Sequence, residues 1–269
     1  MNYLITGGTG TLGTALTRYL LKKDAQTIRI YSRNEYSQVE MQRELNDPRL
    51  RFLIGDIRDF NRLKRAMSGV DYVIHCAALK HVPVCEYNPI EAIKTNVDGA
   101  VNVIDSAIDC GVKKVINISS DKAVYPINLY GATKLSAEKL FIYSNIYGKD
   151  RTLFSCIRFG NIWGSKGSVI PLWMRQRETG TLTLTDKEMT RYWIDIDDAC
   201  NYVRYFLDIM KGGEIFIPKM KERTMEEIAH EIAPECKLKI IGTRFGEKLA
   251  ERLWTDEEQT KDMGAYYVI

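Results

Sequence analysis

Tyr130 and Lys134, four positions apart, are the pair in this 269-residue sequence whose types and spacing could do acid–base chemistry. On a helix, this spacing puts both side chains on one face. A tyrosine has a pKa of about 10, and a nearby ammonium favours the phenolate, so the pair could move protons near neutral pH. Tyr19 and Lys23 share the spacing, but they fall at the far end of a predicted helix, away from the edge of the sheet where ligands bind. We therefore assign the chemistry to Tyr130 and Lys134.

Four residues just upstream add further reactive groups. Ser119, Ser120, Asp121 and Lys122 end a predicted strand, so hydroxyl, carboxyl and amine groups should emerge at the carboxyl edge of the sheet. A carboxyl beside a lysine in a cleft is a plausible acid–base pair, because each group perturbs the pKa of the other. The predicted catalytic residues are Asp121, Lys122, Tyr130 and Lys134.

A glycine motif, Gly8-x-Gly10-x-x-Gly13, follows the first predicted strand and opens the first predicted helix. In this setting the first glycine permits a tight turn, the second allows backbone to approach a pyrophosphate, and the third lets helix pack on strand. The helix N-terminus adds N–H groups and a positive dipole. The motif predicts a dinucleotide site. Its predicted residues are Thr6, Gly8, Thr9, Gly10, Thr11, Leu12, Gly13, Ser32, Arg33, Asp56, Ile57, Ala77, Ala78, Lys80, Asn96, Ser119, Tyr130 and Lys134.

The end of the second predicted strand bears on which dinucleotide is bound. NAD sites usually carry an acidic residue there, about 20 residues after the glycines, to hold the ribose hydroxyls. This sequence has Ser32 and Arg33 instead, which could hydrogen-bond and neutralise a 2′-phosphate. The pattern favours NADP over NAD. Asp56 and Ile57 suit adenine contact.

The elements that must position these groups alternate between short apolar runs and longer amphipathic stretches, which is typical of an α/β fold with a doubly wound parallel sheet of the Rossmann type. Predicted strands are Tyr3–Thr6, Thr27–Tyr31, Arg51–Ile54, Tyr72–His75, Lys114–Ile118 and Leu153–Ile157. Predicted helices are Leu12–Lys22, Asn61–Met67, Pro89–Asp109 and Tyr130–Tyr147.

After about Gly160 the sequence breaks into isolated short segments, which suggests a small α/β cap over the carboxyl ends of the strands. The segments are a strand at Thr181–Leu184, a helix near Ala199–Met210, a strand at Glu214–Ile217, a helix near Met225–Ala233 and a strand at Lys237–Ile241. We assign residues 1–160 to an NADP-binding domain. Residues 161–269 are assigned mainly to substrate binding, interleaved with the first domain.

Composition excludes several classes of protein. The 38 basic and 35 acidic residues nearly balance and form no charged block, so nucleic acid and membrane surfaces are not expected partners. Six scattered cysteines without a Cys-x-x-Cys pair, and no secretory signal, argue against disulfides and a zinc site and favour the cytoplasm. We expect no metal.

Longer motifs resemble a known family. Together, the glycine motif and the Tyr130–Lys134 pair are similar to the extended short-chain dehydrogenases/reductases. The motifs at 77–83, 120–123 and 126–134 resemble, more specifically, the soluble UDP-N-acetylglucosamine 4,6-dehydratases that invert carbon 5, which belong to the polysaccharide biosynthesis proteins. The likeness continues at 158–161, 164–171, 189–191 and 246–249, and so spans the chain in order.

The resemblance implies an NADP-dependent dehydratase without net redox change. Tyr130 would help remove the proton of the carbon 4 hydroxyl while hydride passes to the nicotinamide. The resulting ketone would acidify carbon 5, from which Lys122 would take a proton while Asp121 protonates the departing carbon 6 hydroxyl. Return of the hydride to carbon 6 and reprotonation of carbon 5 from the opposite face would give UDP-2-acetamido-2,6-dideoxy-β-L-arabino-hex-4-ulose, a precursor of nonulosonic acids such as pseudaminic acid.

The resemblance also implies how the sugar nucleotide is held. Lys80 would contact phosphate or cofactor, and Arg244 with Glu247 would bind diphosphate and ribose. The implied substrate residues are Lys80, Asn161, Ile162, Lys166, Gly167, Ser168, Val169, Ile170, Pro171, Leu172, Arg191, Arg244 and Glu247. This chain has Phe245 where the family motif usually has proline, and members usually continue for some tens of residues beyond Ile269. A homo-oligomer, dimer or hexamer, is expected.

Other functions remain open at this stage. A retaining dehydratase or an epimerase acting on a UDP- or GDP-sugar could use the same scaffold, although a 4-epimerase needs no base for carbon 5 and so leaves Asp121 and Lys122 without a role. Tyr130 favours the inverting group, because the large membrane-bound retaining relatives typically have methionine there. A non-catalytic NADP-binding module is the remaining alternative, but it should have lost the catalytic side chains.

Overall fold

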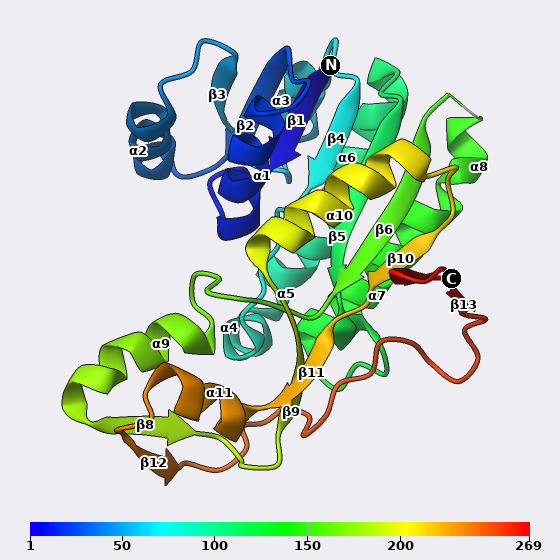
Figure 1. Cartoon of the computed structure of the whole chain (residues 1–269). Helices are drawn as coiled ribbons and strands as arrows, with labels where there is room; N and C mark the ends of the chain where they lie inside the picture. Colours follow the sequence, from blue (N-terminus) through cyan, green and yellow to red (C-terminus); the bar gives the residue numbers. More distant parts are fainter. Residues whose placement is uncertain (150) are drawn as a thin grey trace.

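A computed structural model describes residues 1–149 and 151–269 (Figure 1). Its helices are α1 (Thr11–Leu21), α2 (Glu35–Leu45), α3 (Phe60–Met67), α4 (Val82–Tyr87), α5 (Pro89–Ile93), α6 (Gly99–Cys110), α7 (Leu129–Tyr143), α8 (Asn145–Gly148), α9 (Val169–Gln176), α10 (Ile196–Ile209) and α11 (Met225–Ile232). Its strands are β1 (Asn2–Thr6), β2 (Thr27–Ser32), β3 (Leu50–Ile54), β4 (Tyr72–His75), β5 (Lys114–Ser120), β6 (Leu153–Phe159), β7 (Asn161–Ile162), β8 (Thr181–Leu184), β9 (Thr190–Ile194), β10 (Ile215–Pro218), β11 (Lys221–Thr224), β12 (Lys237–Ile240), β13 (Lys261–Asp262) and β14 (Tyr266–Val268).

The described residues form a main sheet of nine strands in the order β13-β14-β10-β6-β5-β4-β1-β2-β3. The strands from β3 to β10 are parallel. Beyond β10, β14 and then β13 pair in the antiparallel direction. Strand order reverses between β1 and β4, and ligands bind at such a reversal outside the carboxyl ends of the strands. The topology therefore places a binding crevice where the glycine loop begins.

Helices cover both faces of this sheet. On one face α1 packs against α10, and on the other α3 and α7 pack against α6 (Figure 1). Strand residues such as Leu4 and Ile5 consequently have no exposed area, which is why these strands are nearly continuous apolar runs. The predicted doubly wound α/β fold is confirmed.

A smaller lobe lies beyond the carboxyl ends of the parallel strands (Figure 1). It contains α9, α11 and the two-stranded pair β8–β12, packed around buried residues that include Trp173 and Ile228. A second small sheet, β11-β9-β7 in the described residues, connects this lobe to the main sheet.

The sequence assigned too much of the chain to the cap. The predicted segments Ala199–Met210 and Glu214–Ile217 are α10 and β10, which belong to the main sheet and its covering layer. All four residues of β10 are buried because β10 extends the parallel sheet beside β6. Pattern alone cannot say which sheet a short apolar strand joins.

The helices also differ from expectation. The predicted helix Pro89–Asp109 is divided by a π-helical turn at Lys94–Asp98, where the Asn96 side chain leaves the helix to bond the backbone of Leu79. Such turns often occur at functional sites. The predicted helix Tyr130–Tyr147 ends at Tyr143 and resumes as the short α8. Three helices, α2, α4 and α9, were not predicted.

All six cysteines are free thiols. Within the two described ranges, no helix combines the length and apolar character needed to cross a bilayer. No group of three or more His, Cys, Asp or Glu side chains in those ranges is arranged to hold a metal ion.

Candidate active site

Glycines of the phosphate loop lie too close to neighbouring atoms for a side chain to fit at their positions. Gly7 has a φ of 65°, and a Cβ atom there would lie 2.9 Å from the Cα atom of Ala77. A Cβ atom at Gly13 would lie 2.7 Å from the carbonyl oxygen of Gly7. The tight turn is thus made by Gly7, not by Gly8 as predicted, whereas Gly8 allows the loop to pack against Ile30.

The N-terminus of α1 follows this loop and has no side-chain cap, because its N-cap residue is Gly10. Its first N–H groups are therefore available to an anion, and the helix dipole favours negative charge at the same point. These features fit the pyrophosphate of a dinucleotide. Thr9, Gly10, Thr11, Leu12 and Gly13 all line the adjoining cavity.

That cavity has a volume of about 950 Å³ and extends from the glycine loop to the small lobe. Most of the predicted residues for cofactor and substrate line the same continuous space. On the cofactor side these include Ser32, Arg33, Asp56, Ile57, Ala77, Ala78, Ser119, Tyr130 and Lys134. On the substrate side they include Lys80, Asn161, Ile162, Lys166, Gly167, Ser168, Val169, Leu172, Arg191, Arg244 and Glu247.

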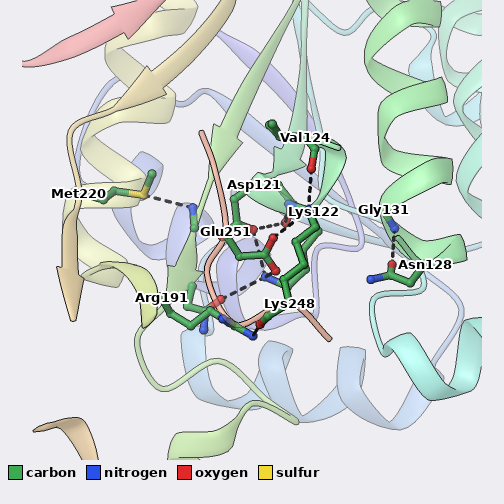
Figure 2. A network of polar contacts seen from close by, with 12 residues as sticks. Asp121, Lys122, Val124, Asn128, Gly131, Arg191, Met220, Lys248 and Glu251 are labelled. Atoms are coloured by element: carbon green, nitrogen blue, oxygen red, sulfur yellow. Dashed lines mark hydrogen bonds and ion pairs between the residues drawn. The ribbon is translucent and has the colours of Figure 1, made fainter. Parts of the chain in front are cut away.

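Tyr130 stands at the start of α7, beside the turn that carries Lys122. Asn128 caps this helix by accepting a 2.8 Å hydrogen bond from the N–H group of Gly131 (Figure 2). A Cβ atom at Gly131 would lie 2.2 Å from the carbonyl oxygen of Lys122, so glycine is what allows the helix to come this close. Burial raises the pKa of the Tyr130 phenol, while the Lys122 ammonium and then a hydrogen bond from Ser120 act in the opposite direction.

Lys134 bonds to the main chain of β5. Its Nζ atom donates a 2.6 Å hydrogen bond to the carbonyl oxygen of Ile118, at the end of β5. The side chain is buried, and burial lowers the pKa of its ammonium group. The cation whose charge lowers the Tyr130 pKa is Lys122, which the four-residue spacing could not indicate.

Asp121 and Lys122 lie in a 3₁₀ turn directly after β5. Lys122 Nζ donates a 3.0 Å hydrogen bond to Asp121 Oδ1 and a 3.5 Å hydrogen bond to Asn161 Oδ1. The Lys122 side chain is 21% exposed and lines the cavity, whereas the Asp121 side chain is 0% exposed. Burial lowers the pKa of Lys122, but Asp121 and then Glu251 outweigh this effect, so the pKa is raised and the group is an ammonium.

Residues 247–258, which we call the strap, cross the floor of this site. Arg191 on β9 donates hydrogen bonds to the carbonyl oxygens of Lys248 (2.9 Å) and Leu249 (3.0 Å). Lys248 Nζ in turn donates a 2.6 Å hydrogen bond to the carbonyl oxygen of Val124 (Figure 2). These contacts bring Glu251, with a side chain only 4% exposed, to within 3.7 Å of Lys122 Nζ.

The far end of the strap is fixed by Arg158. This guanidinium is 1% exposed, forms two hydrogen bonds to Glu138 on α7 (2.7 and 3.0 Å) and donates to the carbonyl oxygen of Leu253 at 2.7 Å. It also meets Glu258 at 3.0 Å. Both carboxylates raise the pKa of Arg158 against the effect of burial. The main sheet thus holds the strap through a buried ion-pair network.

The adenosine end of the cavity carries a different arrangement of charge. Arg33 lies 3.7 Å from Asp56 Oδ2, and its side chain is 55% exposed. Asp56 is also paired with Arg58 at 2.7 Å, and these contacts lower the Asp56 pKa although burial raises it. The Ser32 hydroxyl is buried and accepts a 3.0 Å hydrogen bond from Gln38. Arg33 contacts Asp56 only at this longer distance, and its half-exposed guanidinium lines the cavity, where a ligand can reach it.

The segment after β7 lies against the glycine loop. The backbone N–H group of Lys166 donates a 2.9 Å hydrogen bond to Thr11 Oγ1, and Lys80 Nζ donates to Ser165 Oγ at 3.5 Å. Gly167 has a φ of 74°, and a Cβ atom there would lie 2.4 Å from His81 Cε1. Proposed substrate residues are thus in direct contact with the phosphate loop.

Six predicted site residues do not line the cavity: the catalytic candidate Asp121 and the ligand candidates Thr6, Gly8, Asn96, Ile170 and Pro171. Thr6 bonds to His75 at 2.7 Å beneath the sheet edge, and Asn96 bonds to Leu79 and Thr133. Ile170 packs in the core of the small lobe. These residues support the wall from behind, a distinction that linear motifs do not make.

Glu251 is the acidic cavity residue that sequence analysis missed. It lies three positions after Lys248, a spacing that also describes a common solvated ion pair. Glu251 is buried because it contacts Lys122 and because Arg191 holds the backbone just before it. Both residues are far from Glu251 in the sequence. Arg175 on α9 also lines the cavity and was not predicted.

The strand order, the glycine loop and the cavity with Tyr130 and Lys122 define a nucleotide-binding enzyme of the extended short-chain dehydrogenase/reductase class. The chain belongs to the polysaccharide biosynthesis protein family, whose sequence description matches residues 3–269. The resemblance read from the motifs is confirmed.

Among the relatives are proteins named for two different activities. The UDP-N-acetylglucosamine 4,6-dehydratase (inverting) of Campylobacter jejuni is 48% identical over 274 residues, which cover 100% of this chain and 82% of that protein. A UDP-glucose 4-epimerase of Rickettsia bellii is 45% identical over 278 residues, covering 99% of this chain and 82% of that protein.

Solved structures agree with this placement. The X-ray structure of Pen from Bacillus thuringiensis has 42% identity and a TM-score of 0.96, covering 100% of this chain and 88% of that one. The dTDP-glucose 4,6-dehydratase DesIV of Streptomyces venezuelae, solved with NAD and TYD, has 27% identity and a TM-score of 0.85, covering 94% of this chain and 88% of that one.

Proposed function

We propose that this protein catalyses the NADP-dependent 4,6-dehydration of UDP-N-acetylglucosamine with inversion at carbon 5, giving UDP-2-acetamido-2,6-dideoxy-β-L-arabino-hex-4-ulose. The observation that carries the proposal is the hydrogen-bonded pair Asp121–Lys122 beside Tyr130 in the dinucleotide cavity. A reaction that moves a carbon-bound proton gives both members of this pair a proton-transfer role. The name of the 48% identical Campylobacter relative supports the same substrate and outcome.

Bound NADP would supply the acceptor, and later the donor, of one hydride. Gly7 to Gly13 and the N-terminus of α1 would hold its pyrophosphate, and Arg33 its 2′-phosphate. The similar dehydratase DesIV binds NAD, which supports a nicotinamide dinucleotide, and Arg33 favours the phosphorylated form.

Tyr130 receives the proton of the carbon 4 hydroxyl. Because burial raises the pKa of its phenol, the tyrosine needs the nearby Lys122 cation to ionise near neutral pH. The ketone formed at carbon 4 then makes the hydrogen on carbon 5 acidic enough for removal.

The proton balance of elimination follows from the Asp121–Lys122 hydrogen bond. Transfer of one proton across its 3.0 Å converts the ion pair into a neutral amine and a neutral carboxylic acid. Lys122 takes the proton of carbon 5, the C–H electron pair becomes the double bond to carbon 6, and the proton on Asp121 leaves with the carbon 6 hydroxyl as water. The ion pair is thereby restored. Asp121 is buried, so its side chain or that of Lys122 must move when substrate binds.

Substrate contacts would come from both sides of the cavity. We propose that residues 1–160 mainly hold cofactor and that residues 161–269 mainly hold substrate. Lys80, Lys166 and Arg244 would neutralise the diphosphate, Glu247 would bind the ribose, and Asn161 with residues 162–172 would surround the sugar. Lys80 is suited to an anionic ligand because burial and then Lys122 lower the pKa of its ammonium group, a cost that a bound phosphate would relieve.

A second candidate is 4-epimerisation of a UDP-sugar, which the name of the Rickettsia relative favours. In that reaction the hydride returns to carbon 4 and carbon 5 keeps its hydrogen. Asp121 and Lys122 would then have no proton to transfer, which is why we prefer dehydration.

The deciding experiment is incubation of the NADP-loaded enzyme with UDP-N-acetylglucosamine in deuterated water, followed by NMR of the product. A 4-keto-6-deoxy sugar with deuterium at carbon 5 is expected, and its ring couplings will report the configuration. Formation of UDP-N-acetylgalactosamine without deuterium would establish the epimerase, and retained carbon 5 configuration a retaining dehydratase. Unchanged substrate would contradict all three.

We further propose a cytoplasmic homo-oligomer. The free state of all six cysteines suits a reducing compartment. Tyr87 on α4 and Ile90 on α5 are 87% and 64% exposed, which suits burial against a second copy. Light scattering coupled to gel filtration tests the assembly: a monomer at micromolar concentration would contradict it.

A further inference from the structure

The Glu251 carboxylate lies between two ammonium groups. Its Oε1 atom is 3.7 Å from Lys122 Nζ, and its Oε2 atom is 3.2 Å from Lys248 Nζ (Figure 2). The side chain is 4% exposed, and among the described residues Oε2 accepts no hydrogen bond. Burying a carboxylate this well costs free energy unless the carboxylate is paired. Its two lysine neighbours provide that pairing, and we ask what its charge does for Lys122.

The strap sets this position without help from Lys122. Arg191 holds the carbonyl oxygens of Lys248 and Leu249, and Lys248 Nζ is bound to the carbonyl oxygen of Val124. The backbone on the N-terminal side of Glu251 is therefore fixed by its own contacts. These contacts hold the Glu251 carboxylate close to Lys122.

Charged groups reach Lys122 from each surrounding element. Asp121 on the same turn and Glu251 on the strap are carboxylates that raise its pKa, with Asp121 the larger influence. Arg191 on β9 lowers it, and Lys80 after β4 is a second cation whose own pKa Lys122 depresses. Tyr130 on α7 completes the set. Arg191 and Lys80 therefore repel the Lys122 ammonium from two sides. Asp121 counters this repulsion, and Glu251 supplies a second negative charge that does the same.

We propose that Glu251 is a positioning residue that orients the Lys122 amine and strengthens it as the base for carbon 5. This inference rests on the proposed dehydration, because that reaction requires a base at this point. As the N–H bond forms and the C–H bond breaks, Lys122 becomes an ammonium, and the Glu251 carboxylate stabilises that charge. Glu251 itself transfers no proton, since the proton for the departing hydroxyl comes from Asp121.

The test is the titration of Lys122 in the folded, ligand-free protein, followed by NMR of ¹³Cε-labelled lysine. Loss of one resonance in Lys122→Arg assigns the signal. Replacement Glu251→Gln removes the charge and is expected to lower the titration midpoint of Lys122 by about one pH unit or more, the usual effect of an opposite charge at this distance. Glu257→Gln removes the same charge from an exposed strap position and should leave the midpoint unchanged.

An equal midpoint in wild type and Glu251→Gln would overturn the inference. Glu251→Asp keeps the charge but withdraws it by one methylene, so an intermediate midpoint is expected. If Glu251→Gln does not fold, a lowered midpoint in Glu251→Asp supports the inference and an unchanged one overturns it.

Turnover provides a separate measurement. In Glu251→Gln, kcat should fall and its alkaline limb should move to lower pH with the Lys122 midpoint, while KM for UDP-N-acetylglucosamine changes little. A fall in kcat without any shift of that limb indicates a merely structural role and contradicts the proposal. Failure of the wild-type enzyme to form product would overturn the proposed function, whereas the NMR titration would still decide the role of Glu251.

Discussion

Lys134 Nζ donates a 2.6 Å hydrogen bond to the carbonyl oxygen of Ile118 and so ties α7, near its N-terminus, to the end of β5. The helical spacing of Tyr130 and Lys134 would have predicted a direct partnership. In the structure, the cation that opposes the buried environment of Tyr130 is Lys122. The acid–base behaviour of Tyr130 should therefore follow Lys122.

The pH dependence of carbon 4 oxidation tests this relationship. Lys122→Met removes the cation, so the pKa of Tyr130 should rise further and the pH of half-maximal oxidation should increase by about one unit or more. The measurement is the absorbance of reduced nicotinamide in a single turnover with UDP-N-acetylglucosamine. Lys122→Arg retains the charge and should keep a midpoint near that of wild type. Equal midpoints in the Met and Arg variants would contradict the assignment.

Elimination should respond differently to substitution of Lys122. Lys122→Ala and Lys122→Arg should both lower kcat for dehydration by roughly 10²–10⁴, the usual effect of losing a positioned base. Arginine fails here because its guanidinium does not release a proton. Cofactor binding, measured by fluorescence titration, should be intact. Loss of NADP binding would instead place Lys122 in the cofactor site. The control is Lys64→Ala, which removes a lysine from an exposed ion pair.

Cofactor choice should depend on Arg33. Arg33→Ala should raise the Kd of NADP on the order of 10–100-fold, since a hydrogen bond to a charged group contributes about 1.5–3 kcal/mol. Binding of NAD should be almost unaffected, because NAD lacks the 2′-phosphate. Isothermal titration with both dinucleotides measures the effect, with the exposed Arg43→Ala as the matched control. Tighter binding of NAD than NADP by the wild-type protein would contradict the assignment.

The anchor of the strap should appear in the acid stability of the protein. Burial raises the pKa of Glu258, but its bonds to Arg158 outweigh this and lower it. Because the folded pKa is depressed, the stabilisation is fully present above the unfolded value of about 4.3 and is lost as pH falls through the folded value. Glu258→Gln should lower the free energy of unfolding by about 1–3 kcal/mol at neutral pH.

Urea unfolding at a series of pH values measures that difference between wild type and Glu258→Gln. The difference should shrink on the acid side of the transition, because wild-type Glu258 becomes protonated there. Glu257→Gln, at an exposed position on the same strap, should have little effect. A difference that stays constant through the acid range would exclude the ion pair as its source.

Local pattern was sufficient for the central part of the fold. The apolar runs predicted at Tyr3–Thr6 and Tyr72–His75 match β1 and β4 to within a residue, because strands buried on both faces admit few polar residues. The helix α2 was missed because only Gln38 and Met41 of its residues are buried, which leaves no apolar stripe. Likewise, β10 gave no sign that it pairs with β6 rather than with the small lobe.

The site was predictable where its residues are adjacent in sequence and not where they meet through folding. Asp121, Lys122 and Tyr130 stand together because β5, its following turn and α7 are consecutive. Glu251 reaches them through Arg191 and Lys248, and nothing near Glu251 in the sequence signals that contact. The hydrogen bond of Lys134 was hidden for the same reason: helical spacing predicts a face shared with Tyr130, but the carbonyl oxygen of Ile118, which Lys134 reaches, lies on a different element.

Arg191 holds the strap by main-chain carbonyl oxygens, so this contact does not depend on which side chains the strap carries. Leu249 and Ala250 are exposed next to the held carbonyls, and either could be replaced without loosening the chain that carries Glu251. A substitution at either exposed position should therefore leave the groups around Lys122 in place. Arg191 thus makes the strap tolerant of mutation at the exposed positions beside the carbonyl oxygens that it holds.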